Sequence, residues 1–163
     1  MATTAAGISS TTVTTDQQAP LGFELEVPTA NAGTEVWVYV KAEAALTAGK
    51  IVMFENAASA YEVSLTPTAL ADAVTAPRIV GVAQHDIASG SYGFVLAKGF
   101  GLITAGNGAV LTANQGVTYG GTTVLGTGLS FTAGTAAPSG MVGHCTVAST
   151  GTGGNATCFI NTL

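Results

Sequence analysis

The sequence predicts an all-β protein, a small antiparallel β-barrel or sandwich with an extended N-terminal arm and at most one short helix. Three observations predict this fold class. β-Branched and aromatic residues occur in short runs, some of which alternate with a period of two. Gly and Asn interrupt these runs at short intervals, as the turns of sandwiches and barrels require. Helical periodicity is almost absent.

The clearest strand is predicted at residues 35–43, with the sequence EVWVYVKAE. Because successive side chains of a strand point to opposite faces, Val36, Val38 and Val40 share one face and Trp37, Tyr39 and Lys41 share the other. Further strands are predicted at residues 23–27, 50–55, 79–84, 93–98, 102–104, 141–147 and 156–161.

One short helix is predicted at residues 66–73. Thr66 is a capping residue, Pro67 occupies the first helical position, and good helix formers follow. Pro77 ends the segment, so the helix would have one or two turns.

A chain of 163 residues suits a single β domain, here residues 21–163, preceded by an arm at residues 1–20. The arm has no periodic apolar pattern and one charged residue, Asp16. It is expected to be either a disordered end or an extended segment that orders only when it pairs with the sheet edge of a partner.

Targeting and membrane signals are not recognisable in the sequence. The first 19 residues contain no basic residue and no apolar run, and no stretch approaches the roughly 18 apolar residues that a spanning helix requires. We therefore expect a soluble protein that is made in the cytoplasm and makes no membrane contact.

Charged residues are scarce and unevenly placed. They make up 8% of the chain, against roughly 25% in an ordinary soluble domain. All of them lie between Asp16 and Lys98, and residues 99–163 contain none. Either this region is merely neutral and rich in Gly and Thr, or it lies against neighbouring subunits. The second alternative predicts a homo-oligomer, a trimer in preference to a dimer.

Nucleic-acid binding is excluded by the charge balance. The net charge is −5, and the four basic residues are widely spread. A surface that binds phosphates requires clustered Lys and Arg.

No catalytic or metal-binding constellation is recognisable, so we expect neither an enzyme nor a cofactor. His85 and Asp86 are adjacent, and adjacent strand residues point to opposite faces. Asp86 is better suited to accept backbone N–H groups in a turn. Glu24 and Glu26 share a strand face, which is most simply a solvated one, and the glycines of residues 151–154 lack the Lys of a phosphate loop.

Cys145 and Cys158 are placed symmetrically about a Gly-rich turn. An antiparallel hairpin centred between Gly151 and Thr152 would put them directly opposite each other. We therefore predict neighbouring cysteines on adjacent strands. Two buried free thiols, a disulfide and half of a metal site all remain open, the thiols being favoured by a reducing cytoplasm.

A turn pattern recurs along the chain. Residues 45–52 and 86–95 each contain an apolar residue, small residues, a Gly suited to positive φ and then a strand, and residues 111–117 follow the pattern more loosely. The recurrence indicates either similar turn chemistry or a true internal repeat.

Two stretches carry a resemblance to a known family. The first is residues 37–42 (WVYVKA) followed by 45–52 (ALTAGKIV), and the second is residues 78–84 (RIVGVAQ) followed by 86–95 (DIASGSYGFV) and Gly99. They resemble the small head-decoration (cement) proteins of tailed bacteriophages over residues 21–104. Residues 105–163 lie outside the resemblance.

The resemblance implies an all-β fold, no enzymatic activity, and binding to the outer face of an assembled capsid, often as oligomers. The resulting hypothesis is a virion protein on the capsid outer surface that stabilises the shell by bridging subunits of the major capsid protein. The alternative is a head-fibre base or tail-tip module that contacts host glycans.

Large aromatic side chains are the best candidates for contact with a partner, because such groups dominate interfaces. The candidate interface residues are Trp37, Tyr39, Tyr92 and Phe94. The alternative for Trp37 and Tyr39 is that they fill the core of the barrel or sandwich.

Overall fold

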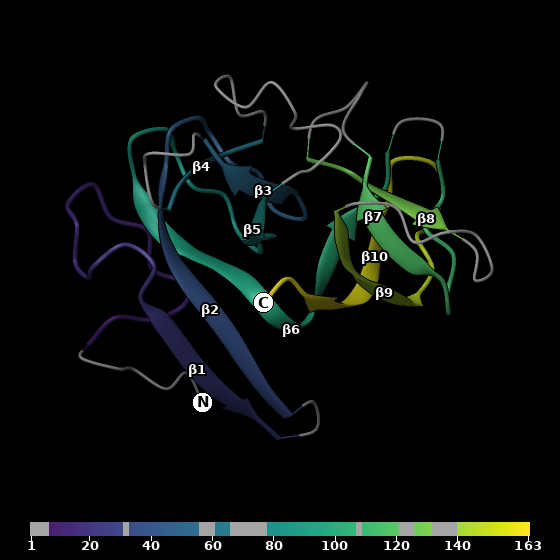
Figure 1. Cartoon of the computed structure of the whole chain (residues 1–163), viewed down its shortest axis with the longest axis horizontal. Coiled ribbons are helices and arrows are strands. Elements are labelled where there is room, and N and C mark those ends of the chain that lie inside the picture. The colour runs from purple at the N-terminus through teal and green to yellow at the C-terminus, as the bar shows by residue number, and fades with distance from the viewer. Residues whose placement is uncertain are drawn as a thin grey trace.

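The computed structural model describes residues 7–30, 33–55, 61–65, 78–106, 109–120, 126–131 and 140–163, and these residues form an all-β fold (Figure 1). The ten strands are β1 (Glu24–Thr29), β2 (Gly33–Ala42), β3 (Ile51–Phe54), β4 (Glu62–Ser64), β5 (Ile79–Val82), β6 (Tyr92–Thr104), β7 (Gly116–Tyr119), β8 (Gly128–Phe131), β9 (Met141–Val147) and β10 (Asn155–Asn161). The predicted fold class is confirmed. The helix predicted at residues 66–73 lies outside the described residues, and the described part of the chain contains no helix that could cross a membrane.

Five strands close into a barrel. The ladder runs β2-β4-β3-β5-β6, and a further pairing between β6 and β2 closes it. All of these pairings are antiparallel except β2–β4, which is parallel and short. The Lys41 ammonium lies 3.1 Å from the Glu62 carboxylate across this parallel pair. β1 adds to the outer edge of β2.

The second half of the chain builds a second sheet on β6. Its order is β6-β10-β9-β7-β8, so the long strand β6 belongs to both the barrel and this sheet (Figure 1). The sequence predicted separate strands at 93–98 and 102–104, and this was wrong: β6 is continuous from Tyr92 to Thr104. Gly99 lies inside this strand with its backbone close to Glu35, where a β-carbon would lie 2.7 Å from Cγ.

A β-bulge in β6 reverses which side its alternate side chains face at the point where the strand leaves the barrel. Trp37 pairs with Leu96, and the next residue of β2, Val36, pairs with Lys98. Ala97 is therefore an extra residue of β6 that has no partner in β2. A bulge of one residue shifts the alternation of side chains. The even-numbered residues of β6 beyond the bulge therefore point to the opposite side from the even-numbered residues before it.

Two apolar cores lie on the two sides of the barrel wall. One fills the barrel and includes Val38, Val40 and Val95. The other lies between the outside of the barrel and the second sheet, and includes Trp37, Tyr39, Phe94, Ile103, Val117, Cys145 and Ile160. The alternation predicted for 35–43 is thus confirmed, but both faces of β2 are buried.

The N-terminal segment packs on its own domain. Thr14 and Tyr92 exchange two backbone hydrogen bonds of 2.8 and 3.0 Å, and the Gln18 N–H donates to the Tyr39 hydroxyl at 3.0 Å. Ile8 and Ala19 pack against the core outside the barrel. Within the described residues 7–20, the expectation of an arm that orders only on a partner is therefore corrected.

The two recurrent turns pair with each other. The Gly49 N–H donates to the carbonyl of Ala83 at 2.7 Å, and the Gly90 N–H donates to the carbonyl of Ala42 at 2.7 Å. Both glycines have positive φ, 81° and 77°. The apolar residues three positions earlier, Leu46 and Ile87, form an antiparallel bridge. The two turns are thus related by an approximate two-fold arrangement.

The third turn repeats this geometry in the second sheet. The Asn114 N–H donates to the carbonyl of Cys145 at 2.8 Å, and the Ser149 N–H donates to the carbonyl of Leu111 at 3.0 Å. Asn114 has φ 64° and occupies the place of the glycine in the other two turns. Residues 111–114 therefore pack against β9 and the residues that follow it with the same turn that the barrel uses.

Candidate interaction face

Exposed apolar side chains gather on the second sheet. Of the nine large apolar side chains that the described residues expose, five belong to β6, β8 and β9: Phe100, Leu102, Leu129, Met141 and Val147. A sheet with one face on a core normally presents polar residues on the other face. This concentration therefore marks the outer face of the second sheet as a candidate interaction surface.

A row of rings crosses all five strands of that sheet. The strand register pairs Phe100 with Phe159, Phe159 with His144, His144 with Gly116, and Gly116 with Phe131. The rings of Phe100 and Phe159 meet edge to face with centroids 5.2 Å apart, and His144 and Phe159 are 5.6 Å apart. Phe100 is 41% exposed, and His144 is also exposed.

Gly116 keeps the row continuous at its far end. A β-carbon built at Gly116 would overlap the ring of Phe131, so this ring lies over the glycine. Close approach of a ring to a strand backbone is one of the reasons for a glycine inside a strand. We call the outward residues Phe100, Leu102, Phe131, Met141, His144 and Phe159 the aromatic face.

The aromatic face has no charge. Its described residues all come from the region without Asp, Glu, Lys or Arg. The exposed Lys98 lies two residues before Phe100 on the same side of β6 and borders the face at the end of β10, where it pairs with Asn161. The opposite side of the same strands carries Cys145, Cys158 and Val117, which are fully buried. The second sheet is therefore apolar on both sides, with a core on one side only.

The predicted interface residues lie elsewhere. Tyr39 and Phe94 are at most 1% exposed and Trp37 is 8% exposed. Tyr39 packs against Phe94 and against the half-buried Tyr92, with ring centroids 5.0 and 6.2 Å apart. Trp37 and Tyr39 therefore support the core-filling alternative, and the expectation that they and Phe94 form an exposed contact surface is corrected; for the half-buried Tyr92 a contact with a partner stays a prediction. The alternation in 155–161 signals Phe159, but no sequence signal says which of its faces is outward.

The two cysteines face each other across β9 and β10. Cys145 is the direct partner of Cys158 in the strand register, the arrangement expected from their spacing. Both are free and buried. Burial, with the neighbouring Cys145, raises the pKa of Cys158 to about 12. Cys158 is therefore a neutral thiol at neutral pH, and it lies beside the buried Cys145 in an apolar layer.

We expect both thiols to be unreactive in the folded protein. The thiolate is the reacting species, and a raised pKa keeps Cys158 protonated at neutral pH. Ellman's reagent should detect two thiols per chain in the urea-unfolded protein and essentially none in the folded protein. Because the pKa of Cys158 is higher in the folded than in the unfolded protein, the free energy of unfolding should fall as the pH rises from about 9 towards 12. Cys158→Ala should reduce this loss, and a chain without titratable thiols in urea would contradict the free pair.

The other titratable groups considered in the sequence have structural roles. The Asp86 carboxylate accepts the Ala48 N–H at 2.9 Å, which is the turn role expected for it. Burial lowers the pKa of His85, and the charge of Asp86 opposes this effect. Glu24 and Glu26 are exposed on β1. Among the described residues, no group of three His, Cys, Asp or Glu could hold a metal ion.

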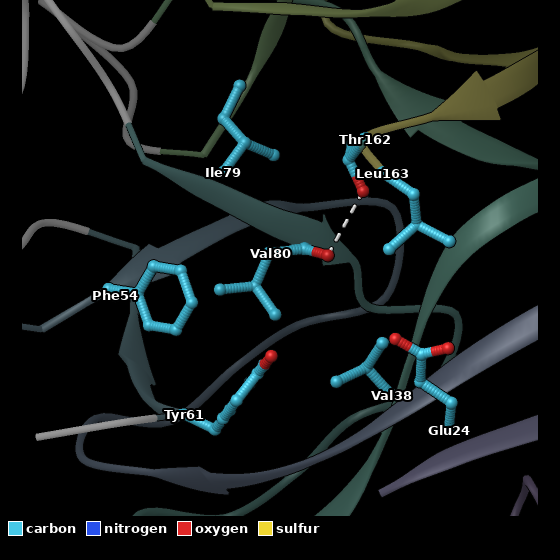
Figure 2. Close-up of a pocket in the computed structure, with 8 residues that line it drawn as sticks. All are labelled: Glu24, Val38, Phe54, Tyr61, Ile79, Val80, Thr162 and Leu163. Carbon is cyan, nitrogen blue, oxygen red and sulfur yellow. Dashed lines mark hydrogen bonds between the residues drawn. The ribbon is translucent and has the colours of Figure 1, made fainter. Parts of the chain in front are cut away.

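A small pocket lies between barrel residues and the last two residues of the sequence, Thr162 and Leu163 (Figure 2). Its volume is about 180 Å³, and its walls include Val38, Phe54, Ile79 and Val80. The Thr162 hydroxyl donates to the carbonyl of Val80 at 3.0 Å and ties the chain end to β5. Leu163 completes the apolar part of the wall, and the remaining lining residues are Glu24, Tyr61 and Thr162.

Comparisons with known proteins concern the fold. No protein-family model matches the chain, and no curated protein matches its sequence. Among solved structures, the chain is similar to the crystal structure of the head fiber gp8.5 N base in bacteriophage phi29, with a TM-score of 0.51 and 20% sequence identity. The match covers 78% of this chain and 95% of that chain. At this identity the similarity shows a shared fold.

Proposed function

We propose that this protein is a non-enzymatic structural component of a bacteriophage virion that binds the outer surface of the head and stabilises it by bridging subunits of the major capsid protein. The observation that carries the proposal is the fold similarity to a phage head-fibre base over 95% of that chain. The sequence pattern of head-decoration proteins adds support, because residues 37–52 and 78–99 form the strands and paired turns of the barrel.

The stabilising mechanism is thermodynamic linkage. A protein that binds only where several coat subunits have come together favours the assembled, expanded shell over states that lack the site. Such a role needs a rigid surface and no chemistry. A charged fraction of 8% suits it, because few long side chains lose entropy when the surface is covered.

A head-fibre base is the second candidate, and it is favoured because the similar phi29 protein is itself the base of a head fibre. Both roles require attachment to the head, and they differ in whether the protein covers the shell or carries a projecting fibre. A module that binds host glycans through aromatic loops is less well supported, because the described aromatic row lies on strands rather than in loops.

The proposal is tested by adding the purified protein to expanded heads that lack it. We expect saturable co-sedimentation with a fixed ratio to the coat protein, and heads that break at a higher temperature. Unexpanded proheads are the control and should bind less. No binding to expanded heads would contradict the proposal. Immunogold labelling of virions separates the two roles: label over the whole head indicates decoration, and label on projections indicates a fibre base.

A further inference from the structure

We infer that the aromatic face is the site at which a second copy of this chain packs, with the same face of each copy against the other. Association through the second sheet does not depend on the proposed attachment to a phage head.

Charge favours a second copy as the occupant. Each chain carries a net charge of −5, and every charged residue lies between Asp16 and Lys98. Two like-charged molecules repel least, and desolvate the fewest charges, when they meet through their neutral sides. A partner selected by charge would require complementary charges on this face, and its described residues have none; Lys98 is at its border, two residues before Phe100 on β6. The neutral aromatic face is therefore best matched by an equally neutral one.

The composition of the face suits association. Interface cores are enriched in aromatic residues and Met and depleted in charged residues, as here. Thr157 and Thr118 lie beside the ring row in the strand register, and neither carries a long flexible side chain. Little side-chain entropy is lost when such a surface is covered.

The size of the face predicts a weak dimer. A sheet offers about 16 Å² per residue, from a rise of about 3.4 Å and a strand spacing of about 4.8 Å. Over β7 to β10 and the part of β6 that pairs with β10, this amounts to about 500 Å² per copy, or about 1,000 Å² in total, near the lower limit for specific interfaces. A face that packs on itself closes with two copies. The expected species is therefore a reversible dimer rather than the trimer favoured by the uncharged composition of residues 99–163.

His144→Glu is the test substitution. His144 is exposed near the middle of the ring row, so a glutamate should leave the monomer folded and place two like charges in the dimer interface. Ala88→Glu is the matched control, since it adds the same side chain at an exposed turn of the barrel. Sedimentation equilibrium should show a dimer for the wild type and the control, and at least about tenfold weaker association for His144→Glu, about 1.4 kcal/mol.

A charge exchange then tests whether like faces meet. His144→Lys alone should also associate weakly, and an equimolar mixture with His144→Glu should recover the dimer, because opposite charges then face each other. Failure of the mixture to recover, or a wild-type trimer, would overturn packing of like faces. A wild type that stays monomeric while His144→Glu loses binding to heads would assign the face to the coat instead. Failure of the wild type to bind heads, with dimerisation intact, would contradict only the proposed function.

Discussion

Replacing Gly143 with alanine is expected to unfold the second sheet. Gly143 lies in β9 opposite Ile160 of β10, and an added β-carbon would overlap the carbonyl oxygen of Phe159. The obstacle is backbone, and β10 is held on its other side by β6, so neither strand can move aside cheaply. We expect a loss of about 4 kcal/mol or more in the free energy of unfolding, or failure to fold. Urea unfolding followed by circular dichroism measures it.

Gly90→Ala is the control for a glycine substitution as such. Gly90 has φ 77°, which strains any other residue, but a β-carbon there meets nothing within 4 Å. The expected cost is therefore about 1–2 kcal/mol, from the left-handed backbone alone. If Gly143→Ala were no more destabilising than Gly90→Ala, the close β9–β10 contact would not be present in solution.

Deleting residues 1–19 is expected to destabilise the domain. The deletion removes the two backbone bonds between Thr14 and Tyr92, the bond from Gln18 to the Tyr39 hydroxyl, and the packing of Ile8 and Ala19 on the core. At a net contribution of about 0.5–1.5 kcal/mol each, the three hydrogen bonds correspond to a loss of about 2–4 kcal/mol in the free energy of unfolding. Thermal unfolding should show a clearly lower midpoint.

Tyr39→Phe isolates one of these contacts. It removes the hydroxyl that accepts the Gln18 N–H and keeps the ring in the core, so the expected loss is about 1 kcal/mol. An unfolding curve that is unchanged by the deletion of residues 1–19 would show that the segment adds nothing to stability. Composition alone favours that outcome, because the segment has no periodic apolar pattern.

Local patterns predicted much of the barrel and the hairpin of the second sheet. The alternation in 35–43 placed β2, and the symmetric spacing of Cys145 and Cys158 about the Gly-rich turn placed the register of β9 and β10. The strands β4, β7 and β8 were not predicted, because runs of three or four residues are too short for a period of two to stand out. Their place depends on the longer strands beside them.

Residue type and spacing were enough to predict the fold class, the strands with strong alternation, the cysteine register and the neutrality of residues 99–163. Which faces are covered depends on how the whole chain packs. Alternation continued through β6 would place Phe100 and Leu102 on the same side as Phe94 and Leu96, in the core. The bulge at Ala97 turns them outward, where they join Phe159 and His144. A period of two says which residues share a face, but long-range packing decides which face meets solvent.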